Sequence, residues 1–548
     1  MLTDLPPEII GLISYHIVLD TGAPPAALLA TSHHIHAAAS PTPELYARVF
    51  RDHYDSSAAV RRLGPLKSRD FGAELRTRTA AFARLNAGEV QARDLWVVYV
   101  MLLENDGKNI RHLTRPLAPG PGTDMVALIN SFHARTLASR GTYPPERVED
   151  ALAMWIAWLL DDHSTRTQAS LRALRPYVFA AHNYELFFAP WTLLNVPTPL
   201  RRPYAPGPFV VDTNPQPRAN VVSLYGRQVT LAHPPLTHAA MLRFFAGPQD
   251  GDVPSSATSN STPTDTAFDT GATSDLRAFP RPVNLSPAHD ADFARLQACP
   301  DGRKSAGRPI LAWRGVFAGC WEGTFTFLDF DAFRDMLRGE GGTQPVYSGA
   351  YGEQAQVWKL RETFVRLKTG AAGGSGSAAA ATAGGSSSSS SSSGPRNALP
   401  LRGPMTNAGF PTTLRDFNLA SIASRPPGVS PEDATINDAV GRQLEALDDY
   451  EPVPEDEVDA ALAADTPDLA LLVTGVGHSA WGRFIISGHV RVWDGLCYLV
   501  KEYAPDQRGK WIYRGYVTND DIMVGRWRDT FTHDDYVGYE GTFILSRR

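Results

Sequence analysis

The segment from residue 471 to the C-terminus constrains the fold more than any other part of the chain. It holds six runs in which apolar and polar residues alternate, recurring every eight to twelve residues: LLVTGV, WGRFIISGHVRVW, LCYLVKEY, KWIYRGYV, DIMVGRWRDTF and GTFILSRR. Such alternation predicts strands, and the joints are turn-like, with Asp494-Gly495 as a two-residue hairpin signal and longer turns at APDQRG and TNDD. Because no helical pattern interrupts the series, we expect an antiparallel meander closed into a barrel.

Two earlier segments extend this β-rich region toward the N-terminus. Residues 316–330 (VFAGCWEGTFTFLDF) and 356–369 (QVWKLRETFVRLKT) alternate in the same way. After them comes a Gly/Ser/Ala-rich tract at 369–397 and then a polar, partly acidic stretch that continues to residue 468. We therefore expect an antiparallel β-barrel over residues 310–548, with a disordered insertion at about 369–468.

The first half of the chain predicts helices. Residues 60–195 contain four amphipathic segments with apolar residues at i, i+3 and i+4, and we expect Trp155 and Trp158 to pack in a core. Residues 196–246 form a mixed connector with one strand pair and one helix, and residues 247–284 have the Ser/Thr/Pro/Asp composition of a disordered linker. The predicted class is α+β multidomain: an N-terminal helical region and a C-terminal antiparallel β-barrel-like domain interrupted by long disordered loops.

Charge and composition narrow the function classes. The formal net charge is −6, and ten acidic residues without any Lys or Arg lie between residues 444 and 468, so the remainder is nearly neutral. No block of Lys and Arg interleaved with aromatic residues is present, which argues against a nucleic-acid partner.

The apolar runs and the cysteines point to an intracellular protein. The longest apolar runs, 95–103 and 151–160, are shorter than the roughly 20 residues that cross a bilayer, and the N-terminus lacks the basic start of a signal peptide. Three cysteines without a C-x-x-C pair fit a reducing compartment. We expect a location in the cytoplasm, the nucleus or both, without a membrane partner.

Ser479 is the most conspicuous candidate for catalysis, because it follows an apolar run in the order Gly-His-Ser. The hydrolase motif G-x-S-x-G needs a glycine two places after the serine, where this chain has Trp481. The next residues also predict a strand rather than the helix that a hydrolase has there. We interpret Ser479 as a turn serine between two barrel strands.

Other chemical motifs fail in the same way. His33, His34 and His36 do not have the spacing of zinc ligands, and TGVG lacks the Lys-Ser/Thr of a phosphate-binding loop. We expect no catalytic residue, no metal and no cofactor, and hence a protein that is not itself an enzyme.

The N-terminus carries the most specific motif. Pro6 and Pro7 suit the first turn of a helix, and the residues Leu-Pro-x-Glu-Ile-Ile-x-x-Ile at 5–13 are followed by Leu-Leu-Ala-x-Ser-x-x-Ile at 28–35. This pattern resembles the F-box over roughly residues 3–50, with DTGAPP inserted between the first helices and without the Trp often found near its end. The resemblance implies an F-box at residues 1–55. It would bind Skp1 through Leu5, Pro6, Ile9, Ile10, Ile13, Leu28 and Leu29.

The C-terminal region carries a second resemblance. GCWEGTFTFLDFDAFRDML and the segment from residue 480 onward resemble the C-terminal region of fungal F-box proteins and, more distantly, the barrel of some F-box-only substrate receptors. Together the resemblances imply a substrate-recognition adaptor of an SCF-type E3 ubiquitin ligase. Skp1 would link it to the cullin and RING subunits, and the barrel would hold a protein substrate whose identity the sequence leaves open.

The predicted substrate site rests on arginines. Arg526 and Arg528 lie two apart and so share one face of a strand, and with Arg491 and Arg514 they are candidates for lining a barrel mouth that binds an acidic peptide or a phosphate. Solvated arginines on the outside of the barrel are the alternative.

Two other functions stay open at the level of sequence. One is a lipocalin-like barrel that binds a small apolar ligand in an interior without charges. The other is an F-box protein that acts with Skp1 outside a ligase.

Overall fold

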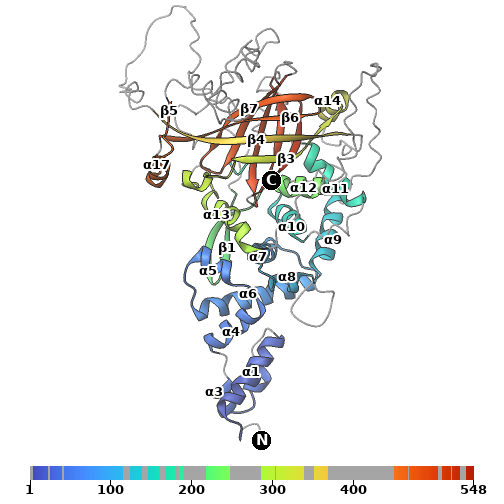
Figure 1. Cartoon of the computed structure of the whole chain (residues 1–548). Coiled ribbons are helices and arrows are strands. Elements are labelled where there is room, and N and C mark those ends of the chain that lie inside the picture. Colours follow the sequence, from blue (N-terminus) through green and yellow to red (C-terminus); the bar gives the residue numbers. More distant parts are fainter. Residues whose placement is uncertain are drawn as a thin grey trace, which may run out of the picture.

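The chain forms a helical body with a β-barrel at one end and a group of short helices at the other (Figure 1). The architecture comes from a computed structural model. It describes residues 4–21, 25–39, 42–114, 124–138, 146–160, 168–180, 184, 186–189, 218–246, 285–302, 304–338, 351–367, 450–466, 468–503, 509–519, 521–530 and 538–548. The predicted linker at 247–284 and residues 369–449 of the predicted insertion lie outside these residues.

Eight antiparallel strands close into a barrel in the order β3-β11-β10-β9-β8-β7-β6-β4, because β4 pairs with β3 as well as with β6. Their bounds are β3 Gly319–Leu328, β4 Tyr351–Leu367, β6 Leu469–Ser479, β7 Gly482–Arg491, β8 Leu496–Tyr503, β9 Lys510–Thr518, β10 Ile522–Asp529 and β11 Glu540–Arg547. A short strand, β5 (Tyr450–Pro452), pairs with the end of β4. The closed antiparallel barrel predicted from the alternation is confirmed.

The barrel interior is packed by aromatic side chains and narrowed by glycines. Trp321 and Trp358 are fully buried inside it. A Cβ atom at Gly488 of β7 would overlap the backbone carbonyl oxygen of Tyr498 on β8. Only glycine therefore permits these two strands to approach so closely.

The turn between β7 and β8 differs from the predicted two-residue hairpin. β7 ends at Arg491 and β8 begins at Leu496, so the connection has four residues, and the amide of Gly495 donates to the carbonyl of Arg491 at 2.8 Å. The Asp494 carboxylate accepts hydrogen bonds from Arg491 and Tyr516 as well as from the Leu496 amide in the turn. The Asp494 side chain therefore makes tertiary contacts, and the turn is longer than the Asp-Gly sequence predicts.

The helical body precedes the barrel in the chain. Its helices are α4 (Pro43–His53), α5 (Ser57–Leu63), α6 (Ser68–Asn86), α7 (Ala92–Leu103), α8 (Asn109–Leu113), α9 (Met125–Ala138), α10 (Val148–Leu159), α11 (Gln168–Phe179) and α12 (Leu236–Phe245). Helices α7 and α10 pack together in the body's centre, and Trp155 and Trp158 are buried there, as predicted. The predicted strand pair is also confirmed as an antiparallel hairpin of β1 (Ala219–Leu224) and β2 (Arg227–Ala232).

A buried ionic network ties that hairpin to the helices. Arg78 on α6 is fully buried, and its guanidinium donates to Glu74 at 2.9 Å and to Glu104 at 2.6 Å. The Tyr225 hydroxyl in the β1–β2 turn joins this network by donating to Glu104 at 2.9 Å. Burial alone disfavours the charge on Arg78, but the two carboxylates and Tyr225 raise its pKa, so the arginine stays protonated.

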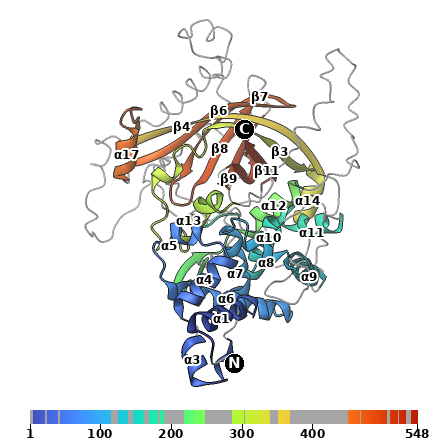
Figure 2. The ribbon, with the colours of Figure 1, turned by 60° about the horizontal axis from the view of Figure 1, so that its bottom comes forward.

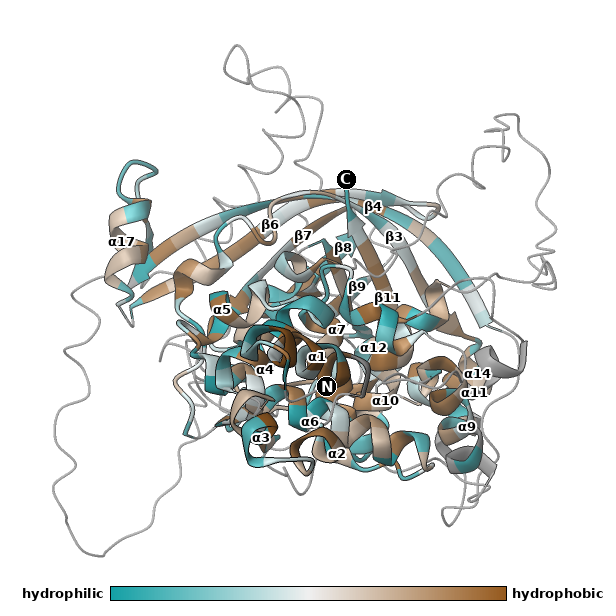
Figure 3. Ribbon diagram, turned by 90° about the horizontal axis from the view of Figure 1, so that it is seen from below, coloured by the Kyte–Doolittle hydropathy of each residue, from teal (hydrophilic) through white to brown (hydrophobic). Residues whose placement is uncertain are grey.

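The barrel's outer wall rests on the helical body. Helix α12 lies against β10 and β11, and Tyr516, Val524 and Ile544 of the outer wall join the same hydrophobic core as the helices. Figure 2 shows α10, α11 and α12 beneath the barrel, and Figure 3 shows the helices in front of its strands when viewed from the α1–α3 side. Further along the chain, α13 (Asp290–Ala298) packs near β2, and α14 (Phe330–Arg338) and α17 (Val458–Ala464) flank the barrel.

Candidate functional site

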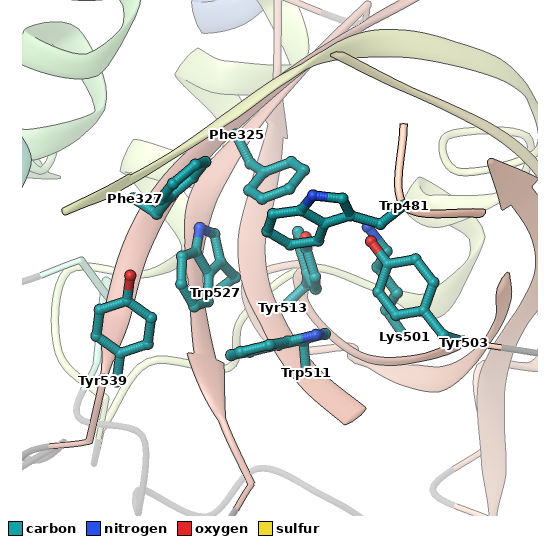
Figure 4. Close-up of a pocket in the computed structure, with 9 residues that line it drawn as sticks. All are labelled: Phe325, Phe327, Trp481, Lys501, Tyr503, Trp511, Tyr513, Trp527 and Tyr539. Atoms are coloured by element: carbon teal, nitrogen blue, oxygen red, sulfur yellow. The ribbon is translucent and has the colours of Figure 1, made fainter. Parts of the chain in front are cut away.

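One end of the barrel opens into an aromatic pocket of about 300 Å³, a volume that includes the open solvent at its mouth. Nine side chains line it, contributed by four of the eight barrel strands (β3, β8, β9 and β10), the β6–β7 turn and the residue that precedes β11 (Figure 4). They are Phe325, Phe327, Trp481, Lys501, Tyr503, Trp511, Tyr513, Trp527 and Tyr539. A wall made almost wholly of rings offers a large apolar contact area with few polar groups, which is typical of a small-molecule site.

Ring contacts fix the walls of the pocket. The Trp527 ring meets Trp511 edge-on, with 5.1 Å between centroids, and meets Tyr539 at 5.4 Å in the same manner. The indole N–H of Trp527 donates to the backbone carbonyl of Thr326 at 2.9 Å, which fixes its orientation. Trp481 reaches across the opening from the β6–β7 turn and lies 5.5 Å from the Phe325 ring. Edge-to-face pairs at these separations are favourable, so the walls are well defined.

Lys501 of β8 is the one charged side chain among the pocket-lining residues. It is 1% exposed, and its Nζ donates to Oε1 of Gln356 at 3.0 Å. The Nζ atom also lies 4.0 Å from the Phe484 ring centroid and 4.8 Å from that of Tyr503. Burial lowers the pKa of Lys501 well below its usual value, since a charged amine loses its water there.

Ser479 has the structural role predicted for it. It ends β6 opposite Gly482, so Ala480 and Trp481 form the turn to β7. Its hydroxyl lies 3.0 Å from the Tyr503 hydroxyl and accepts a hydrogen bond from the Trp481 amide at 3.3 Å. These contacts hold Trp481 over the pocket, a structural task for this hydroxyl.

The four candidate substrate-binding arginines do not lie at this mouth. Arg491, Arg514, Arg526 and Arg528 are 3–4% exposed and alternate with interior residues, so they belong to the barrel's outer wall. Arg526 donates to the backbone carbonyls of Tyr184 at 3.2 Å and Tyr177 at 3.1 Å. The expectation that these arginines line a barrel mouth is therefore wrong.

Three of these arginines do form the cluster that their spacing predicted. Arg514 and Arg526 are direct cross-strand partners, and Arg514 pairs with the carboxylate of Glu540 at 3.6 Å. Burial raises the pKa of Glu540, while Arg526, Arg514 and Arg528 lower it. The cluster faces the helical body, where Arg526 contacts Tyr177 and Tyr184.

Of the residues predicted to face Skp1, Leu5 and Pro6 precede α1 (Pro7–Thr21), and the others lie on α1 and α2 (Ala26–Leu29). Helix α3 (His33–Ala39) packs against both helices. Ile10 is fully buried against Ile35 and Ala39, whereas Ile9 is 43% exposed. Pro6 is exposed, and Leu5, Ile13, Leu28 and Leu29 are half-buried. Leu12, which the motif did not single out, is 45% exposed beside Ile9 on α1.

The described residues also bear on metal sites and on membrane spans. They contain no group of three His, Cys, Asp or Glu side chains arranged to hold a metal ion. In the same part of the chain, no helix combines the length and the apolar character needed to cross a bilayer.

Comparison of the chain with known protein families, with curated proteins and with solved structures gave no match.

Proposed function

We propose that this chain is a substrate-recognition adaptor of an SCF-type E3 ubiquitin ligase. Helices α1–α3 would bind Skp1, and through it the cullin and RING subunits, while the barrel domain would hold a protein substrate. The bond-forming chemistry belongs to those partners, so the adaptor needs no active site of its own.

The observation that carries the proposal is the apolar face left open on α1. Ile9 and Leu12 are 43% and 45% exposed, although each is a large aliphatic side chain. Burying one such side chain against a partner contributes about 1.5–3 kcal/mol before the costs of association. The first half of the F-box-like motif, residues 5–13, lies largely on this helix.

The position of α1–α3 also supports an adaptor role. They form a small cluster of their own around Ile10, Ile35 and Ala39, braced by a hydrogen bond from Ser14 Oγ to the Ala39 carbonyl at 2.8 Å. The cluster lies at the tip of the molecule remote from the barrel (Figure 1). A partner at this tip would leave the barrel accessible, as an adaptor requires.

The test is a pull-down of the full chain with purified Skp1. We expect the native chain to bind and Ile9→Asp to weaken binding at least about 100-fold, since a charge would enter an apolar interface. Val60→Asp is the matched control, because Val60 is also 45% exposed but lies on α5 of the helical body. Ile10 is unsuitable for this purpose, since its substitution would unpack the cluster.

A second arm adds the cullin and RING subunits. Co-purification of all four chains supports a ligase, whereas a complex that stops at Skp1 supports the alternative of an F-box protein acting outside one. Failure of the native chain to bind Skp1 contradicts both.

A further inference from the structure

Lys501 is a buried amine without an acidic partner in the described part of the chain. Lys501 Nζ donates one hydrogen bond to Gln356 Oε1 at 3.0 Å. A protonated amine has three N–H donors, so it could donate to a ligand as well. Removing an ammonium ion from water is costly unless a counter-charge compensates it. A negative charge that entered the pocket would supply this compensation and favour the protonated form of Lys501.

The aromatic rings around Lys501 can stabilise its protonated amine. Besides Phe484 and Tyr503, the centroids of Phe325 and Tyr513 lie 4.9 and 5.6 Å from Nζ. The negative face of an aromatic ring attracts a cation, and the attraction is stronger away from water. An incoming anion would add to this effect and so favour protonation of the amine.

The other residues that line the pocket indicate what kind of ligand body would fit beside the negative charge. Trp481, Trp511, Trp527 and Tyr539 offer ring faces and edges, and the indole Nε1 of Trp511 is buried without an acceptor among the described residues. Because these groups are almost all aromatic, they suit a flat ring better than a polar body.

We propose that this pocket binds a small organic acid with an aromatic body, whose carboxylate accepts a hydrogen bond from Lys501 Nζ. The ring system of the ligand lies against the tryptophans, as offset or edge-on stacking requires. This inference does not depend on the F-box assignment, because the pocket belongs to the barrel and the α1–α3 cluster lies at the tip remote from the barrel (Figure 1). It revises the picture of a charge-free container: the pocket is apolar except for one buried amine.

The first test compares acids with neutral analogues on the full chain. Isothermal titration calorimetry with 3-phenylpropionate and indole-3-acetate, each against its primary amide, measures the contribution of the carboxylate. We expect each acid to bind at least about 10-fold more tightly than its amide, as charge-assisted hydrogen bonds predict. Equal affinities, or no binding by either acid at about 1 mM, would overturn the proposal.

The second test assigns the preference to Lys501. Lys501→Met keeps the length and apolar stem of the side chain, and we expect it to abolish the preference for acid over amide. Lys510→Met is the matched control, since Lys510 lies nearby on β9 but pairs with Glu502 at 3.0 Å. An unchanged acid preference in a folded Lys501→Met variant contradicts the assignment. If that variant does not fold, the acid-amide comparison on the native chain decides alone.

Discussion

The carboxylate of Asp494 lies 2.8 Å from Nε of Arg491, and both side chains are almost completely buried where the barrel meets the helical body. Tyr516 donates to the same carboxylate at 2.7 Å, and Arg491 also donates to the carbonyl of Ala189 at 3.2 Å. The Arg491–Asp494 pair thus links a barrel turn, the barrel wall and the segment at Ala189. This pair joins two parts of the fold that are about 300 residues apart in sequence.

Loss of the Asp494 charge is expected to destabilise the fold strongly. In Asp494→Asn the guanidinium of Arg491 stays buried without its counter-ion, and breaking a buried pair in this way costs about 3–5 kcal/mol. Urea unfolding followed by circular dichroism measures the change. Asp331→Asn is the control, since Asp331 and Arg334 form a largely exposed pair and such pairs contribute about 0–1 kcal/mol. Equal stability of the two variants would contradict the role given to Asp494.

His238 is expected to make stability depend on pH. Its ring is buried between Phe188 and Tyr516, Nε2 lies 2.8 Å from the Leu186 carbonyl, and burial lowers its pKa to about 3. The unfolded chain binds this proton near pH 6.5 and the folded chain does not. Stability from this group is therefore complete above about pH 6.5 and falls by about 1.4 kcal/mol per pH unit as the pH drops toward 3.

The matching variant is His238→Gln, which keeps a donor for the Leu186 carbonyl and removes the titration. Unfolding free energies measured between about pH 6 and 4 should fall less steeply for this variant, by about 1.4 kcal/mol per pH unit. His133 and His233 titrate in both proteins, since burial lowers the pKa of each to about 3, so they cancel in the comparison. Parallel curves would mean that His238 is protonated in the folded state.

The strands could be predicted because apolar and polar residues alternate in each of them. Which face of each strand lies inside the barrel could not be predicted. In β8, Tyr498 and Val500 belong to the outer wall, while Leu499 and Lys501 point inward. Both faces are buried, the inner by the barrel and the outer by the chain around it, so the hydrophobic pattern does not say which face is the interior. Lys501 therefore could not be recognised as a pocket residue from the sequence.

Burial of the outer face of the barrel also explains why the positions of the arginines were predicted wrongly. Spacing two apart correctly placed Arg526 and Arg528 on one face, but charge made that face look solvated. The carbonyls of Tyr184 and Tyr177, which accept the hydrogen bonds of Arg526, lie 342 and 349 positions earlier in the chain. A contact so distant in sequence leaves no local signal, and a guanidinium is buried readily when backbone carbonyls accept its hydrogen bonds.

Glycine positions inside the barrel are expected to be intolerant of a side chain. In Gly488→Ala the new methyl group would overlap the Tyr498 carbonyl, which belongs to backbone and cannot move aside, so we expect a loss of about 3 kcal/mol. Gly11→Ala is the control: on helix α1 the added Cβ has 4.0 Å to its nearest neighbour, and alanine favours helix, so stability should rise slightly. Thermal melts of both variants check this, and a neutral Gly488→Ala would contradict the packing of β7 on β8.

Arg526 is expected to stabilise the barrel's attachment to the body. Arg526→Met removes the donors for the Tyr177 and Tyr184 carbonyls, and leaving buried carbonyls without partners costs about 1–3 kcal/mol. Arg483→Met, at an exposed position of β7, should stay within about 0.5 kcal/mol of the native chain. Hydrogen exchange adds a local measure, because amides at 186–189 should exchange faster in Arg526→Met only. If Arg526→Met instead matched Arg483→Met in both measurements, the two hydrogen bonds of Arg526 would not stabilise the attachment of the barrel to the body.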